Sequence, residues 1–395
     1  MIKETREVYN AAFTETAYQQ LLAELNKNLP RKIEFRIAET PVFLPLAFKE
    51  KLVQAGNELV ATIRKENFKQ LTERSIPDNW RVAHEKRHPH FLTFDFAVCR
   101  NATGELTPKL IELQGFPSLY AFQAELAEQF QKHFPVTRDF TPYFYHSDQK
   151  SYFELLRRTI IGTSLPEEVI LLDINAAEQK TAVDFYLTAK HLGIAIVALH
   201  ELKQRGSQFY YSRDGIEHPI KKIYNRLIFD EIEDKNIAFQ NVPDLLTTDQ
   251  LEWVTHPNWF YRISKYTMPF LESEFVPATY FLSELKTIPV DLQNYVLKPL
   301  FSFAGQGVLI DVSEEDIKAI PDPENWILQE KVIYEPAIET PDGSVKCEIR
   351  LMYLWPDEEE EPVLAICLAR LSRGKMIGVR YNKDFNWVGG TVGLF

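Results

Sequence analysis

The sequence predicts a mixed α+β and α/β protein, and three patterns support this fold class. Between about residues 151 and 235, apolar β-type runs alternate with stretches of helical spacing, which is typical of a parallel βαβ unit. After about residue 290, apolar runs of period two follow one another, and only one helical stretch intervenes, at 313–320. Before residue 135, two helical segments precede a pair of β-rich runs. An alternating middle region is therefore expected between two regions in which neighbouring strands pair.

Periodicity and turn residues place the individual elements. In the first region we expect helices at 13–29, 45–71 and 119–134, and strands at 91–99 and 106–113 joined by a turn at 101–104. In the middle region we expect helices at 151–161 and 177–192, strands at 169–173, 194–198 and 220–228, and a hairpin at 214–215. In the last region we expect strands at 295–300, 307–311, 326–333, 345–355 and 362–370.

Composition limits the classes of partner. Of 395 residues, 45% are hydrophobic and 25% charged, as in soluble globular proteins, and the net charge of −12 argues against nucleic acid or anionic membranes as main partners. The three cysteines include no CxxC pair and are expected to be reduced core residues. Because the N-terminus lacks a signal-peptide pattern and no apolar run is long enough for a membrane span, we expect a cytoplasmic protein.

The stretch 295–309 is the first candidate for chemistry. An apolar run ends at Lys298, Pro299 stops the strand, and a small-residue loop ending in Gly305, Gln306 and Gly307 leads into a second apolar run. Such a hairpin can lay backbone N–H groups and one ammonium group over an anion. An ordinary β-hairpin with a lysine at its edge explains the same residues.

Two downstream strands give that hairpin a context. The strand 326–333 becomes polar at Gln329 and Glu330, so its backbone could face the edge of a purine ring. In the strand 346–353, period two places Glu348 and Arg350 on one face, where an arginine could neutralise phosphate charge. Arg370 ends the next apolar run.

The order of these segments resembles the ATP-grasp superfamily over about residues 220 to 395. The run 295–309 is similar to its lysine strand and phosphate loop, 326–332 to its adenine-binding hinge, and 276–279 (Val-Pro-Ala-Thr) to its recurring Val-Pro-x-Thr step. The resemblance implies two α+β subdomains that sandwich ATP. The residues that it assigns to ATP are Lys265, Lys298, Ser302, Gly305, Gln306, Gly307, Gln329, Glu330, Lys331 and Val332.

The carboxylate strand and Glu-x-Asn step with which the superfamily usually ends are missing from the C-terminus. A similar pattern occurs instead at Glu112 and Gln114, with Asp95 on the preceding strand. This order resembles the circularly permuted ATP-grasp enzymes similar to glutathionylspermidine synthase, and it implies that these three residues hold Mg²⁺. Gln114 replaces an asparagine of those relatives, and Thr93 stands where they have an arginine. Arg81, Arg350 or Arg370 must then neutralise the transferring phosphoryl group, or turnover is lost.

Structural alternatives remain open for each of these roles. Asp95 also fits a polar residue of an edge strand, and Arg350 fits an exposed strand residue, whereas Glu112 in an apolar strand needs a partner or a metal. We interpret the cluster of His84, His88 and His90 as a basic loop, and the acidic run 357–361 as a solvated hairpin tip. Asn225 and Arg226 end a strand in a region that faces substrate in the family, but a salt-bridged structural arginine fits equally well.

The resulting hypothesis is an ATP- and Mg²⁺-dependent ligase that joins a small-molecule or peptide-like carboxylate to an amine or thiol through an acyl-phosphate. Arg350 and Arg370 are its expected catalytic arginines. A regulatory ATP-binding protein without turnover and a kinase acting on a hydroxyl are the alternatives. The expected organisation is 1–150 (helices and the metal strand pair), 151–235 (a pre-ATP-grasp-like α/β domain) and 236–395 (the nucleotide-binding region). The sequence leaves the acceptor, the amine and the oligomeric state open.

Overall fold

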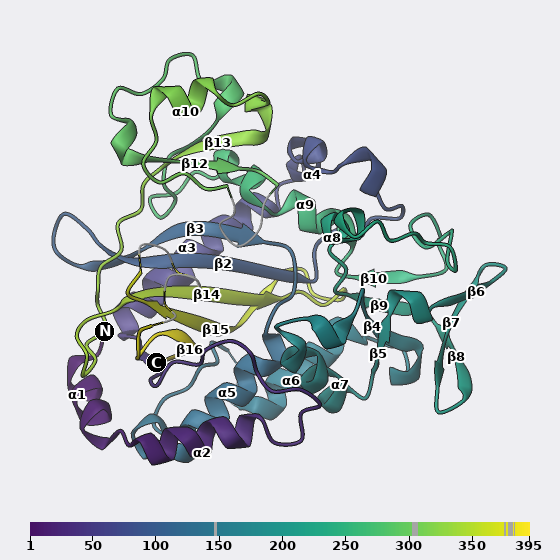
Figure 1. Cartoon of the computed structure of the whole chain (residues 1–395), viewed down its shortest axis with the longest axis horizontal. Coiled ribbons are helices and arrows are strands. Elements are labelled where there is room, and N and C mark those ends of the chain that lie inside the picture. The colour runs from purple at the N-terminus through teal and green to yellow at the C-terminus, as the bar shows by residue number, and fades with distance from the viewer. Residues whose placement is uncertain (146–147, 302–306, 375–376, 378–381, 383) are drawn as a thin grey trace.

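A six-stranded sheet lies at the centre of the structure, a computed structural model that describes the whole chain except residues 146–147, 302–306, 375–376, 378–381 and 383 (Figure 1). Its strand order is β1-β16-β15-β14-β2-β3. The strands are β1 (Val42–Phe43), β16 (Gly389–Leu394), β15 (Val363–Ser372), β14 (Lys346–Leu354), β2 (Phe91–Arg100) and β3 (Leu106–Gln114). The hairpin β2–β3 from the first third of the chain thus pairs with strands from its last fifty residues.

The β2–β3 hairpin forms as its sequence predicts. Asn101 accepts hydrogen bonds at Oδ1 from the backbone N–H groups of Thr103 and Glu105, which closes the turn. The register places Asp95 opposite Glu112 and Thr93 opposite Gln114. On the other side of β2, Asp95 lies opposite Arg350 of β14. Three predicted site residues are therefore cross-strand neighbours.

The two faces of the central sheet have different environments. One face packs on α3 (Leu46–Ile63), which shares a hydrophobic cluster with Phe94, Ile349 and Leu351. Part of the other face packs on α5 (Tyr120–His133), which shares a cluster with Met352 and Leu354. Because side chains alternate along a strand, the charged residues Asp95, Glu348 and Arg350 lie on the face that α3 does not cover.

Three smaller sheets lie outside this centre, one above it and two on its right in Figure 1. A parallel sheet has the order β10-β9-β4-β5, with β4 (Val169–Asp173), β5 (Ala195–Ala198), β9 (Lys222–Asn225) and β10 (Glu252–Val254). A second sheet consists of β6 (Lys203–Arg205), β7 (Gln208–Arg213) and β8 (Ile216–Ile220). The third has the order β11-β13-β12, with β11 (Thr279–Phe281), β12 (Tyr295–Pro299) and β13 (Trp326–Glu330).

The remaining helices lie around these sheets. The described ones are α1 (Lys3–Ala12), α2 (Glu15–Leu25), α4 (Phe68–Leu71), α6 (Gln149–Ile160), α7 (Ala182–Leu192), α8 (Phe229–Asp234), α9 (Pro257–Arg262) and α10 (Glu314–Lys318). In the α/β region, α7 connects the parallel strands β4 and β5, as the alternating pattern predicts.

Some predicted elements are wrong in extent. The helix expected at 45–71 ends at Ile63, and only the single turn α4 follows the polar residues 64–67. The strand expected at 307–311 is reduced to one bridge between Leu309 and Leu297. Helix α1 was not predicted, because Val8 and Tyr9 are nearly its only large apolar residues. The alternation of strands and helices in the middle region is confirmed.

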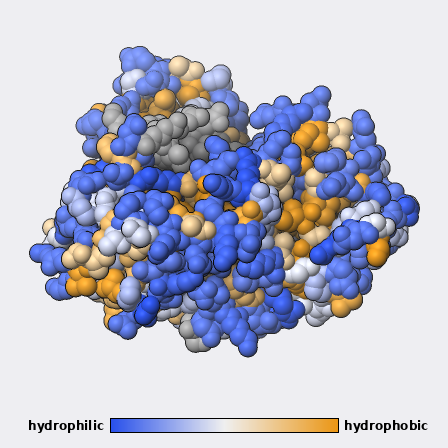
Figure 2. All heavy atoms as spheres, turned by 60° about the horizontal axis from the view of Figure 1, so that its bottom comes forward, coloured by the Kyte–Doolittle hydropathy of each residue, from blue (hydrophilic) through white to orange (hydrophobic). Residues whose placement is uncertain are grey.

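Hydrophobic and hydrophilic residues share the surface of the molecule. On the face shown in Figure 2 hydrophilic residues predominate and hydrophobic residues form separate groups. Among the described residues no helix combines the length and the apolar character that a bilayer crossing requires.

The close packing of β16 against the segment 36–38 gives a test of the central sheet. Gly389 has φ +127°, and a Cβ atom there would lie 2.5 Å from the carbonyl oxygen of Arg36. We expect Gly389→Ala to lower the free energy of unfolding by about 3 kcal/mol, because it adds backbone strain and overpacking. Urea unfolding followed by circular dichroism measures this change.

The neighbouring Gly390→Ala is the matched control. Its Cβ would meet Arg36 O at an ordinary 3.9 Å, so we expect a loss below about 1 kcal/mol. Equal losses in the two variants would contradict the proposed packing of β16.

Candidate functional site

A buried network of charges lies where β2, β14 and β15 run side by side. The Arg350 guanidinium donates from Nε to Asp95 Oδ1 and from Nη2 to Asp95 Oδ2, each at 2.6 Å. Arg370 Nη2 donates to Asp95 Oδ2 at 2.7 Å and also pairs with Glu348. Both oxygens of Asp95 therefore already accept charge-assisted hydrogen bonds.

Burial makes these pairings necessary. Asp95 is 1% exposed, and an isolated buried carboxylate would be protonated. Burial alone would raise the pKa of Asp95, but the charges of Arg350 and then Arg370 outweigh it and hold this pKa below its usual value. Burial raises the pKa of Glu348, and only Arg370, among its main neighbours, opposes that effect by its charge.

Lys298 reaches the same region from the small sheet. It lies near the end of β12, and its Nζ donates to the Ile111 carbonyl on β3 at 3.2 Å and to Gln329 Oε1 at 2.6 Å. Gln329 in turn donates from Nε2 to Thr279 Oγ1 at 2.9 Å. The strands β11, β13 and β12 thus hold one lysine against the edge of the central sheet.

The pKa of Lys298 is lowered to about 8 by burial, which the carboxylate of Glu112 only partly offsets. Lys265, which lies in a 3-10 helix (Lys265–Phe270), is also buried. Burial lowers its pKa, and the charge of the Glu112 carboxylate partly opposes this effect. The predicted pair of lysines is therefore present, and both ammonium groups lie close enough to Glu112 to feel its charge.

Glu112 and Gln114 lie on one face of β3, as period two predicts. Gln114 Nε2 donates to Glu112 Oε1 at 2.9 Å, so this amide points its nitrogen at the carboxylate. Both side chains are only partly buried. The structure therefore brings Asp95, Glu112, Gln114 and Lys298 together, and it places them beside Arg350 and Arg370.

The residues assigned to the phosphate loop are only partly described. Ser302, Gly305 and Gln306 fall outside the described residues, whereas Gly307 is described and has φ +73°. A Cβ atom at Gly307 would come within 3.0 Å of the Pro299 ring, so the return of the chain toward β12 needs a glycine.

The predicted hinge is the central strand of its sheet. Because β13 lies between β11 and β12, the backbone of Gln329 is paired on both sides. The N–H groups of Glu330 and Lys331 donate to the carbonyls of Ala278 and Asn294, at 2.8 and 2.7 Å. Val332 follows the end of β13 and is half-buried.

Sequence reasoning missed two partners of the network. Tyr334 donates from its hydroxyl to Glu348 Oε2 at 2.9 Å, and Glu348 itself was placed on the face of Arg350 without a role. Period two was the available signal for Glu348. Tyr334 carried no signal, because it follows the hinge in an irregular segment.

Arg226 is a further buried cation near the end of β3. It is 7% exposed, and its Nε and Nη1 atoms have no hydrogen-bond partner among the described residues. Its guanidinium carbon lies 4.3 Å from the ring centre of Phe116, which follows Gln114 by two residues. The salt-bridged arginine considered from the sequence is not found among the described ion pairs.

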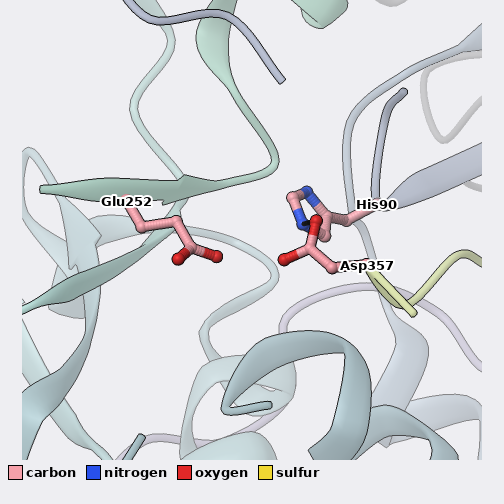
Figure 3. Close-up of side chains that lie close together, drawn as sticks. All are labelled: His90, Glu252 and Asp357. Atoms are coloured by element: carbon pink, nitrogen blue, oxygen red, sulfur yellow. Dashed lines mark ion pairs between the residues drawn. The ribbon is translucent and has the colours of Figure 1, made fainter. Parts of the chain in front are cut away.

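A second cluster joins the parallel sheet to the central sheet (Figure 3). His90, Glu252 and Asp357 point toward one another from the start of β2, from β10 and from the turn after β14, with ligand atoms within 4.8 Å of one another. His90 Nε2 lies 3.3 Å from Asp357 Oδ1. Lys86 pairs with both carboxylates, and Lys222 pairs with Glu252 at 2.9 Å. The two lysines balance the two carboxylates, so the cluster serves as an ionic link between the sheets.

Two predictions concern the residues around this cluster. The segment 84–90 is a loop, as predicted, but His88 and His90 are buried in it. The acidic run 357–361 lies in the turn between β14 and β15 and is largely exposed, as predicted. Its side chains pair with several basic residues, namely Lys86, His90, Arg158 and Arg64.

Comparisons with known proteins support the fold. No family model matches the chain, and no curated protein matches it by sequence. Among solved structures, the chain is similar to a glutathione synthetase-like effector from Globodera pallida, in its apoform. The TM-score is 0.60, the identity is 11%, and the match covers 99% of each chain. At this identity the likeness shows the fold alone, a mixed α+β fold shared with this neighbour over the whole length.

The Asp95–Arg350 pair can be tested by a double-mutant cycle. Arg350→Met leaves a buried carboxylate with half of its partners, so we expect a loss of about 3–5 kcal/mol in the free energy of unfolding. Asp95→Asn combined with Arg350→Met should recover part of that loss. Urea unfolding of the two single variants and the double variant measures the coupling.

Arg157→Met is the control, because Arg157 forms an exposed pair with Glu154. We expect it to change stability by less than about 0.5 kcal/mol. An Arg350→Met variant as stable as this control would show that the buried pair contributes nothing.

Proposed function

We propose that the protein is an ATP-dependent ligase that joins a carboxylate to an amine or thiol through an acyl-phosphate, releasing ADP and phosphate. The observation that carries this proposal is the convergence of Lys298, Glu112 and Arg370 from two different sheets within an ATP-grasp-like fold. Cations held close together on rigid strands suit a polyphosphate, since phosphoryl transfer depends on positioning and charge neutralisation.

ATP would lie between the β11-β13-β12 sheet and the central sheet. Lys298 and Lys265 would contact its phosphates. The adenine edge would meet the chain at Gln329–Val332, but the backbone N–H groups of Glu330 and Lys331 are already engaged. The proposal therefore assigns the backbone of Val332 to the purine, and assigns Gln329 to holding Lys298 in place.

A magnesium ion fits only part of the predicted ligand set. Glu112 offers two carboxylate oxygens, one of which accepts from the Gln114 amide nitrogen, and Gln114 adds an amide carbonyl oxygen. These hard oxygens suit Mg²⁺, which usually binds through one or two carboxylates and substrate phosphates. When bound there, the ion would supply charge to the phosphate oxygens. Asp95 does not fit as a ligand, because both of its oxygens accept from arginines.

The acceptor carboxylate is assigned to Arg226. Two buried guanidinium nitrogens of Arg226 have no hydrogen-bond partner among the described residues, and its place beside Phe116, just after β3, suits a planar anion near Gln114. An arginine fork recognises a carboxylate through two parallel hydrogen bonds. The glutathione synthetase-like name of the structural neighbour supports a peptide-like acceptor.

The reaction would proceed in two steps. A carboxylate oxygen of the acceptor attacks the γ-phosphorus of ATP, the bond to the bridging oxygen breaks, and ADP leaves. Arg370 neutralises charge on the transferring group, and Arg350 lies near it on the neighbouring strand β14. The amine then attacks the acyl carbon, inorganic phosphate leaves, and the amine proton passes to solvent.

A nucleotide-binding protein without turnover is the second candidate. It is favoured by the engagement of Asp95 with two arginines, which removes one expected metal ligand. Circular permutation remains part of the proposal. Its support is that β2 and β3 complete the sheet formed by β14, β15 and β16, although they come far earlier in the chain.

The acyl-phosphate step makes an isotope prediction. With γ-glutamylcysteine labelled with oxygen-18 in its carboxylates, glycine and Mg·ATP, we expect one labelled oxygen in the released phosphate. Mass spectrometry of that phosphate measures the transfer. ADP formed with unlabelled phosphate would contradict the acyl-phosphate, and ATP binding without ADP formation would favour the second candidate for this substrate pair.

The low pKa of Lys298 predicts a pH dependence of nucleotide binding. An anion stabilises the ammonium form, so affinity should be constant below the free-state pKa of about 8. Above that pH, binding must restore a proton, and affinity should fall by about tenfold per pH unit. Isothermal titration calorimetry with a non-hydrolysable ATP analogue from pH 6.5 to 9.5 tests this. Lys298→Gln should bind more weakly with a flat profile, and an unchanged slope in that variant would contradict the assignment.

A further inference from the structure

The arginine pair of the central sheet has an unequal arrangement. Arg350 is 7% exposed and donates hydrogen bonds from two nitrogens to Asp95, so its charge is largely balanced by that carboxylate within the sheet. The Arg370 side chain is 33% exposed, whereas its Nε is buried and has no hydrogen-bond partner among the described residues. Arg370 is thus the member of the pair that can face a ligand, and Arg350 is the member that satisfies Asp95.

Among the described residues of this network the balance of charge is already positive. Asp95, Glu112 and Glu348 face the four cations Lys265, Lys298, Arg350 and Arg370. A free divalent cation would add to this excess, whereas a triphosphate would reverse it. In a partly buried site this difference is larger than it would be in water.

From these contacts we propose that Asp95 is an anchor that fixes Arg350 and Arg370 as a permanent cationic pair, and that the site therefore binds a nucleoside triphosphate without a divalent metal ion. This inference rests on the proposed function, because it concerns the same nucleotide site. Asp95 holds the arginines against the phosphate, and they provide part of the charge that Mg²⁺ provides elsewhere. Glu112 then binds a divalent metal ion only when the nucleotide enters the site with that ion already bound.

The test compares the binding of AMP-PNP, a non-hydrolysable ATP analogue, by calorimetry in excess EDTA and in excess Mg²⁺. We expect the two dissociation constants to agree within about fivefold. Binding that requires Mg²⁺, with a loss above about thirtyfold in EDTA, would overturn the inference and leave the proposed function standing. No binding in either condition would overturn both.

Arg370→Gln identifies the residue responsible. In EDTA it should weaken AMP-PNP binding by at least about tenfold, the cost of one hydrogen bond to a charged group, and by less in Mg²⁺. Arg373→Gln is the matched control and should change neither value. Arg373 lies three residues later and binds Thr340 and the carbonyls of Asp342 and Gly343.

Thermal unfolding of both variants shows whether they are folded. If Arg370→Gln does not fold, the comparison in EDTA and Mg²⁺ with the unaltered protein still decides the matter. Equal losses for Arg370→Gln in EDTA and in Mg²⁺ would overturn the role of the arginine pair as a substitute for metal charge.

Discussion

The buried ion pair between Asp95 and Arg350 is the constraint on which the centre of the structure depends. A carboxylate in this position is tolerable only if its charge is matched, and both matching arginines come from strands more than 250 positions later. The β2–β3 hairpin must therefore dock in one register against β14, because a shift of one residue would turn Asp95 toward the apolar cluster beneath α3. The register of the sheet and the contacts of the charged network therefore depend on each other.

The β11-β13-β12 sheet contacts that assembly through Lys298. Lys298 extends from β12 to a backbone carbonyl of β3 and also donates to Gln329 of β13, which in turn donates to Thr279 of β11. The lysine is costly to bury, which is why its pKa falls. In the proposed function, a phosphate beside Lys298 would offset that cost.

The local sequence pattern predicted the features that depend on residues close together in the chain. Period two placed Glu112 with Gln114 and Glu348 with Arg350, and the turn at 101–104 fixed the hairpin that carries Asp95. Ion pairs between side chains on strands that are distant in sequence could not be predicted from this pattern. Asp95 was assigned to a metal because two carboxylates and an amide suit one, whereas the arginines that engage it became visible only once β2 and β14 were paired. The burial of His90 was not predicted for a similar reason, because its partner Asp357 comes from a distant part of the sequence.

The turn after β14 has a practical consequence for work on this protein. By sequence it is the obvious place to open the chain, since five acidic residues join two strong strands. Its side chains are nevertheless tied to α3, α6 and the segment before β2 through Arg64, Arg158 and His90. An epitope tag or fluorescent domain inserted there would separate three parts of the molecule. The 101–104 turn, where space surrounds Gly104, is the better site for a fusion.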